Sequence, residues 1–186
     1  METCVWDLIL EHTDATFPWA QFNDAVEAGF PITTATRAGS GALCKAAGRS
    51  MSAVTKRLLD LGCDPFDTDD YSQSPMHLAA HVNAVDVCKV LPVQCLTART
   101  FLQNTPLHTA VCAGAVQVVQ WMLEQPCAPV DARNRRGLTP REEAERMEYR
   151  LIERADMLAA FAAHGRWSPL RAAWIGAAVG TKNTYR

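Results

Sequence analysis

Apolar residues recur along this chain in pairs of short helical patterns, with polar stretches between the pairs. Residues 41–62, 75–91 and 106–123 each hold two such patterns, in which Leu, Val, Ala and Met fall at the three- and four-residue spacing of one helix face. Gly62 follows the first pair and Pro92 follows the second, and both residue types end helices. The pattern predicts three helical hairpins joined by polar connectors.

A short phrase opens each hairpin. The clearest copies are Ser-Pro-Met-His-Leu-Ala-Ala at 74–80 and Thr-Pro-Leu-His-Thr-Ala-Val at 105–111, and Leu-Thr-Pro at 138–140 starts a third. A weaker copy, Gly-Ala-Leu-Cys-Lys-Ala-Ala, stands at 41–47. The second positions of the copies are separated by 33, 31 and 34 residues, counted in turn from Ala42 to Pro75, Pro106 and Pro140. A period near 33 is typical of a solenoid of stacked helix pairs.

Each position of the phrase has a mechanical interpretation. Ser or Thr places a side-chain oxygen over the first free N–H groups of a helix, and Pro suits the first helical position, where its missing N–H costs nothing. Leu or Met and the two small residues face inward. A His repeated at one helical position predicts that its ring bonds backbone groups at the base of the connector. This position holds Cys44 in the weak copy and Glu142 in the last one.

The flanks predict altered end repeats, as solenoids require where one face meets water. Residues 1–39 contain two apolar patterns, at 3–12 and 20–28, and resemble a degenerate first repeat. We expect three repeats over 40–138, a divergent one over 139–165, and a half-repeat with a tail over 166–186. Arg141–Arg154 is dense in alternating charge, as solvated helices are, and its pattern leaves open whether it is one helix or a broken one.

Bulk composition narrows the class of protein. The chain has 186 residues, 48% of them apolar and 20% charged, which is ordinary for a globular domain. A formal net charge of −2 gives no electrostatic argument for nucleic acid or for an anionic membrane. No apolar run approaches the roughly 20 residues of a membrane span. The first residues lack the basic start and apolar run of a secretory signal.

The seven cysteines are odd in number, lie far apart and form no C-x-x-C pair. Several stand where the repeat has Ala or Val, so we interpret them as small buried apolar residues rather than as a disulfide framework. This usage favours a reducing compartment, the cytosol or the nucleus.

Two groups of residues are candidates for a chemical site. His77 and His81 have the i, i+4 spacing of a metal pair, but His77 is also the structural His of the repeat. A cysteine nucleophile with His108 as its base meets the same objection, and nothing in the sequence activates a particular Cys. Gly39-Ser40-Gly41 is interpreted as a connector, not a phosphate loop. We therefore predict no catalytic residue, no metal ligand and no cofactor.

Taken together, these phrases resemble the ankyrin repeat family. The resemblance rests on Gly62–Pro65 leading to His77–Ala80, on Thr105–His108, and on Val130–Asn134 leading to Thr139-Pro140, and it covers about residues 40–140. It implies an all-α fold of paired antiparallel helices, β-hairpin or loop fingers, and a concave surface that binds other proteins. It implies no enzymatic activity. The departures from the pattern are Cys44, Glu142 and the irregular connector 93–104.

The connectors carry residue types that binding surfaces favour. The stretch 63–73 is acidic with two aromatic residues, 127–138 is basic, and 93–104 lies between them. The expected protein-binding fingertip residues are Phe66, Asp67, Asp69, Asp70, Tyr71, Arg99, Phe101, Arg133, Arg135 and Arg136. On the concave side we expect Lys45, Arg49, His81, Val82 and Ala113. The plainer alternative is that the charged turns are only solvated and that Phe66 or Phe101 packs on a neighbouring finger.

The sequence predicts a non-enzymatic scaffold or adaptor that binds one or more partner proteins and is a monomer when alone. The alternative is a regulatory or inhibitory subunit whose concave face or fingers cover the active site of an enzyme. A third possibility, an enzyme in its own right, requires a pocket with a perturbed titrating group, which this composition does not suggest.

Overall fold

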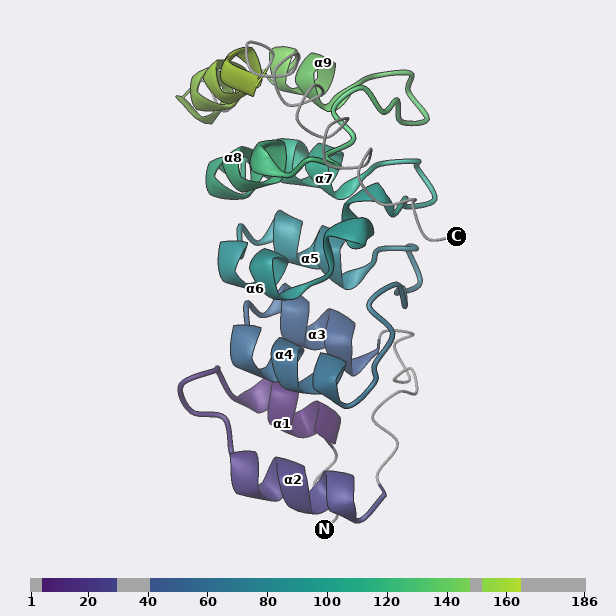
Figure 1. Ribbon diagram of the computed structural model, residues 1–186, viewed down its shortest axis with the longest axis vertical. Helices are drawn as coiled ribbons and strands as arrows, with labels where there is room; N and C mark the ends of the chain where they lie inside the picture. Colours follow the sequence, from purple (N-terminus) through teal and green to yellow (C-terminus); the bar gives the residue numbers. More distant parts are fainter. Residues whose placement is uncertain (1–4, 30–40, 148–151, 165–186) are drawn as a thin grey trace, which may run out of the picture.

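The computed structural model describes residues 5–29, 41–147 and 152–164, and it is a stack of short helices (Figure 1). Within these ranges all regular structure is helical and no strand is assigned. A further helical segment covers residues 152–164. The other elements, in chain order, are α1 (Val5–Glu11), α2 (Trp19–Glu27), α3 (Ala42–Gly48), α4 (Ser52–Asp60), α5 (Pro75–His81), α6 (Val85–Val90), the 3-10 helix η1 (Val93–Thr97), α7 (Pro106–Ala113), α8 (Val116–Glu124) and α9 (Pro140–Glu145).

The helices form two layers, which run the length of the stack. Helices α1, α3, α5, α7 and α9 pack on one another in sequence, and α4, α6 and α8 do the same beside them. Within each pair α3/α4, α5/α6 and α7/α8, the two helices also contact each other. The connectors project to one side, on the right in Figure 1. The all-helical solenoid expected from the sequence is confirmed.

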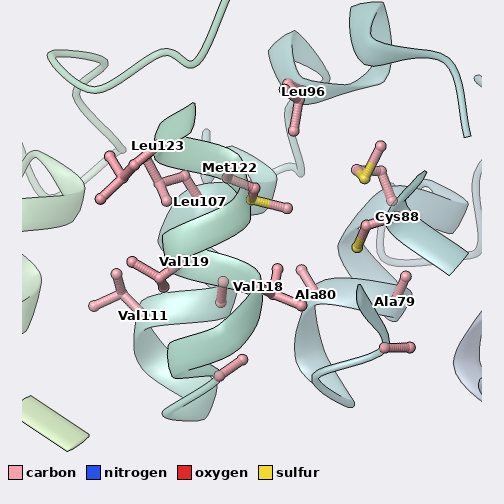
Figure 2. Packing of buried hydrophobic residues seen from close by; sticks show 14 of the residues in the cluster. Ala79, Ala80, Cys88, Leu96, Leu107, Val111, Val118, Val119, Met122 and Leu123 are labelled. Carbon is pink, nitrogen blue, oxygen red and sulfur yellow. The ribbon is translucent and has the colours of Figure 1, made fainter. Parts of the chain in front are cut away.

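The buried core lies between the layers and passes from one pair to the next. Figure 2 shows Val118 and Met122 of α8 directed toward the neighbouring pair, where Ala80 and Cys88 lie. All four side chains are fully buried, and they belong to one cluster that reaches from Ala47 of α3 to the segment 152–164. Because each pair completes the interior of its neighbour, stability depends on the stack as a whole.

A second core cluster joins α1 and α2 to α3 and α4. Val5, Ile9 and Phe22 are fully buried in it, and Phe22 makes edge-to-face contacts with the rings of Phe17 and Trp19. The α1/α2 pair packs on the stack, as the two apolar patterns of residues 1–39 predicted.

Loop side chains cap the helices of a following pair. Oδ1 of Asn83, in the turn between α5 and α6, accepts a hydrogen bond from the backbone N–H of Val118 in α8 (3.2 Å). The carboxylate of Asp14 does the same for α4, accepting from the N–H groups of Ala53 and Val54. These bonds satisfy amides that have no partner within their own helix, and they couple one pair to the next.

The connectors between pairs are loops with one recurring tight turn. We call residues 63–73 the first finger, 93–104 the second finger and 127–138 the third finger. In each finger, the backbone N–H of one residue donates to the carbonyl oxygen of the residue four positions later. The side-chain oxygen of the earlier residue accepts a hydrogen bond from the backbone N–H of the later one. The earlier residues of the three pairs are Asp69, Thr100 and Asn134. The expected β-hairpin form is therefore not seen in these loops.

The turn also fixes a left-handed position one residue before its end. Ser72, Gln103 and Gly137 have φ values of 56°, 60° and 76° there. Only the third finger uses glycine, the residue that adopts this conformation without cost. A left-handed glycine follows α2 and α4, whereas η1 of the second finger follows α6.

The charged stretch 141–154 is not one continuous helix. α9 ends at Glu145, and residues 146 and 147 are not helical. A helix is present again over 152–164, and its Met157 and Phe161 are buried against the core. The expected half-repeat and tail over 166–186 lie outside the described residues.

Candidate functional site

The two histidines of the repeated phrase bind one helix pair to the next finger. His77 Nδ1 lies 3.2 Å from the backbone N of Ser74 and 2.8 Å from its hydroxyl oxygen, and Nε2 lies 3.0 Å from the carbonyl oxygen of Asn104. His108 repeats this arrangement with Thr105 and with the carbonyl oxygen of Leu138 (2.9 Å). The predicted ring-to-backbone bonds are confirmed at both positions.

These bonds determine the protonation state of both rings. A backbone N–H can only donate, so Nδ1 must accept, and a carbonyl oxygen can only accept, so Nε2 carries the hydrogen. The neutral tautomer follows from the geometry. Burial, which disfavours the charged form, lowers the pKa of His77 to about 4, and burial also lowers the pKa of His108. Neither ring has a nitrogen left for a substrate proton or for a metal ion.

The other two copies of the phrase make the same link with weaker or different groups. The thiol of Cys44 lies 3.7 Å from the carbonyl oxygen of Asp67 and 3.9 Å from that of Gln73. Glu142 accepts the N–H of Thr139 through its carboxylate (2.8 Å), and this bond holds its pKa below the usual value. Glu142 closes the capping box of α9.

Every described cysteine with a shifted pKa has it raised. Burial is the main cause that raises the pKa of Cys44 and Cys88 to about 12 and that of Cys95 to about 11. Burial also raises the pKa of Cys63, and the partial burial of the Cys112 thiol together with the nearby Glu143 carboxylate raises that of Cys112, whose side chain still reaches solvent. A thiol with a raised pKa holds little thiolate at neutral pH, and the thiolate is the nucleophile.

The prediction that cysteines act as buried apolar residues is right for four of them and wrong for two, and Cys4 lies outside the described residues. Cys112 and Cys127 are exposed, because they lie at an outward position of α7 and in the third finger. Over the described ranges, no three His, Cys, Asp or Glu side chains are close enough to hold a metal ion. No helix in those ranges could cross a lipid bilayer either, because none combines the needed length with sufficient hydropathy.

A shallow hollow of about 170 Å³ lies between the first and second fingers and the helices α5 and α7. We call it the finger hollow. It brings together four residues expected from the sequence: Tyr71 and Phe101 from the fingers, and His81 and Ala113 from the helices. Tyr71 is 64% exposed and Phe101 is 53% exposed, so both residues present most of their surface to solvent.

Sequence reasoning missed other residues of the finger hollow. Leu102 is 44% exposed and extends the apolar rim, and Asn104, Thr109 and Cys112 form part of the lining. The adjacent apolar pair Phe101-Leu102 in an otherwise polar connector was a signal that could have indicated the rim. Asn104 had no such signal, because its place in the lining depends on how the second finger folds back to α7.

The acidic residues of the first finger partly serve its own turns. Asp69 Oδ1 accepts the N–H groups of Tyr71 (2.9 Å) and Gln73 (2.8 Å), and Asp67 Oδ1 accepts that of Thr68. Asp70 is exposed beside Tyr71 and accepts no bond from a described residue. Phe66 is exposed at 48% but does not line the finger hollow.

The basic residues are used within the protein more than the sequence suggested. Arg133 forms an ion pair with Glu142 (3.1 Å), and Arg136 forms one with Glu143 (3.2 Å), a carboxylate only 9% exposed. Arg99 donates to the carbonyl oxygen of Arg133 (3.0 Å) and so joins the second and third fingers. Only Arg135 of the three third-finger arginines has a side chain without a partner among the described residues.

The remaining residues expected on the concave side lie on or next to the layer formed by α1, α3, α5, α7 and α9, which we call the inner layer. They lie apart from the finger hollow. Lys45 is half-buried on α3, and Arg49, which follows that helix, donates to the carbonyl oxygen of His12 (3.2 Å). Val82 follows α5 and is exposed. The structure thus brings together His81 and Ala113 of the five expected residues.

The stacked helix pairs with fingers on one side define a repeat solenoid. In the comparison with known families, the model for ankyrin repeats (3 copies) matches residues 43–134, which hold α3 to α8 and most of the third finger. The chain belongs to the ankyrin repeat family, whose repeats are generally protein–protein interaction modules. A search among curated proteins found no match to this chain.

Proposed function

We propose that the protein is a non-enzymatic scaffold or adaptor that binds a partner protein through the finger hollow and the adjoining inner layer. The observation that carries this proposal is the exposed apolar rim formed by Tyr71, Phe101 and Leu102 around a concave site. Exposed aromatic side chains grouped at one place mark interaction sites more often than isolated ones do.

Two further observations support an interaction role over catalysis. The two histidines of the repeated phrase, His77 and His108, use both ring nitrogens in structural bonds. The thiol of Cys112, in the lining, has a raised pKa. In this proposal the partner is a protein rather than a nucleic acid, in keeping with the net charge of −2, and the chain alone is a monomer.

The test is affinity capture from the native cell with two matched variants. Tyr71→Ser with Phe101→Ser removes the apolar rim, whereas Ile152→Ser removes an isolated apolar side chain that is 78% exposed and outside the finger hollow. Both are surface changes, so each melting temperature should stay close to that of the unaltered chain.

We expect a partner that the unaltered chain and Ile152→Ser capture equally and that the double variant loses. Equal capture by all three proteins would contradict the proposal. If the captured partner is an enzyme, its turnover with and without the chain decides between a scaffold and a regulatory subunit.

A further inference from the structure

The first finger carries negative charge that no described residue pairs with. It holds Asp64, Asp67, Asp69 and Asp70, and none of these carboxylates forms an ion pair with a described residue. The third finger differs, because Glu142 and Glu143 neutralise two of its arginines. Negative charge at the edge of a concave site favours partners that carry positive charge.

Two of these carboxylates belong to residues next to Tyr71 of the finger hollow, although neither residue forms part of its lining. Asp69 and Asp70 directly precede Tyr71, and the bonds from Tyr71 N–H and Gln73 N–H hold the Asp69 carboxylate in place. The carboxylate of Asp70 has no such bond. A cation near this rim could therefore meet two carboxylates and the exposed face of a tyrosine ring, which also attracts cations.

The opposite wall of the finger hollow offers an unused amide. The side chain of Asn104 lines the site, and its Oδ1 is buried with no hydrogen-bond donor among the described residues. The NH₂ group of the same side chain has no partner there either. A primary amide has one acceptor and two donors, which match the N–H and the C=O of a peptide unit once the amide rotates. A buried acceptor without a donor is an unfavourable state that a bound peptide can relieve.

The size of the finger hollow limits what can fill it. Sites for drug-sized small molecules usually measure roughly 300–1,000 Å³. The finger hollow, at about 170 Å³, is smaller and is open beside apolar Phe101 and Leu102. It suits a single bulky apolar side chain projecting from a chain that continues over the rim.

Building on the proposed function, we propose that the finger hollow binds a partner segment in which a bulky apolar residue stands next to Lys or Arg. The apolar side chain fills the finger hollow between Tyr71 and Phe101. The neighbouring cation lies against Asp69 and Asp70, and the backbone of the segment meets the amide of Asn104. Segments with acidic residues beside the apolar one are excluded by repulsion.

The test is selection of a random dodecapeptide display library on immobilised full-length protein. The charge variant is Asp69→Asn with Asp70→Asn; the first change keeps the turn, because Asn134 performs the same role in the third finger. Its matched control is Asp131→Asn with Asp156→Asn, two exposed carboxylates away from the finger hollow, so that both proteins change by the same net charge. The rim variant Tyr71→Ser with Phe101→Ser completes the set.

We expect enriched peptides in which Lys or Arg lies within two positions of Leu, Ile, Met, Phe or Trp. One synthesised peptide should bind the charge variant at least about threefold more weakly than the control, with an affinity that falls as salt is added. The rim variant should not bind it. Enrichment of acidic or neutral peptides, equal binding to the charge variant and its control, or no enrichment over the rim variant would each overturn the inference.

These failures are separable from failure of the proposed function. If the rim variant still loses the captured cellular partner while the charge variant keeps it, the protein binds a partner at this site but does not select a cationic segment. If both variants keep the partner, the proposed function fails as well.

Discussion

The two central junctions of the stack and the two outer ones use different side chains at the same position of the repeat. At the centre, the His77 and His108 rings are fully buried and bond a helix start on one side and the next finger on the other. Toward the ends, Cys44 offers a weak thiol donor to the first finger, and Glu142 closes its own helix start and pairs with Arg133 of the third finger. The histidine link therefore holds the second and third fingers, whereas the first finger, on the other side of the finger hollow, has the weak thiol bonds of Cys44 at this position.

This difference bears on the proposed binding surface, because the second finger forms one side of the finger hollow. A binding site works best on a support that does not move when the partner arrives. The second finger is held by His77 through Asn104, and Arg99 and the Arg135 N–H to Leu102 carbonyl bond (2.8 Å) join it to the third finger. At the outer junction with α9, the ion pairs of Arg133 with Glu142 and of Arg136 with Glu143 hold the third finger.

The largest loss of stability should come from truncating a side chain of the shared core. This core is packed in the same way at the centre of the stack and toward its ends. Leu107→Ala removes a side chain that is 1% exposed and leaves a cavity, so the free energy of unfolding should fall by roughly 2–5 kcal/mol. Leu43→Ala makes the same change at the equivalent position of the outer pair, and Leu43 is 3% exposed. Urea denaturation measures both, and a loss below about 1 kcal/mol at Leu107 would contradict the packing described.

The next effect should separate the two kinds of junction. His108→Ala leaves the N–H of Thr105 and the carbonyl of Leu138 without their partner, and losses of about 1–3 kcal/mol are typical of buried groups left unpaired. Cys44→Ala removes only weak thiol bonds and should cost less. Urea denaturation of both variants decides the matter, and an equal loss would show that the central junctions are not the stronger ones.

Acid should weaken the central junctions before it weakens anything else in the repeat. The pKa of His77 falls from 6.5 to about 4 on folding, so between these values the unfolded chain binds a proton that the native protein excludes. The stability is fully present above pH 6.5 and is lost as the pH falls toward 4. Between pH 7.5 and 5.5 we expect a loss of about 1 kcal/mol from this residue, and His108 acts in the same direction.

Thermal melts at the two pH values measure this loss. The variant His77→Ala should show a smaller difference between pH 7.5 and pH 5.5 than the unaltered chain does. A difference of the same size in both proteins would assign the pH dependence to other groups.

The smallest effect on stability should come from the third finger, where two arginines differ in their partners. Arg135→Glu changes a side chain without a partner in the described residues, so the free energy of unfolding should change by less than about 0.5 kcal/mol. Arg136→Glu removes the ion pair of the nearly buried Glu143 and places a like charge beside it, so it should lower the melting temperature clearly. Scanning calorimetry of the two variants would contradict this division if Arg135→Glu were the more damaging change.

The sequence predicted the repeated parts of the molecule well because each rests on a local rule. The capping boxes of α5, α7 and α9, the left-handed Gly62 and the Nδ1 bonds of the two histidines all follow from residues a few positions apart. The helix starts at Pro75, Pro106 and Pro140 were predictable for the same reason.

What escaped prediction depends on contacts between distant residues. The basic finger looked free in the sequence, but Arg133 and Arg136 meet carboxylates that follow on α9. The break after Glu145 was left open because residues 141–154 are uniformly helix-forming in composition. The sequence predicted only some of the residues that line the finger hollow, since Asn104 and Leu102 reach it through the fold of the second finger.

The central claim is that the partner sits in the finger hollow, and site-specific photo-crosslinking tests it most directly. A benzophenone amino acid is introduced at Phe101, on the rim, or at Val93, an exposed position on the same finger that does not line the finger hollow. After irradiation in the native cell, we expect the captured partner to be crosslinked from position 101 and not from position 93. Crosslinking from position 93 alone would place the partner elsewhere and contradict the account.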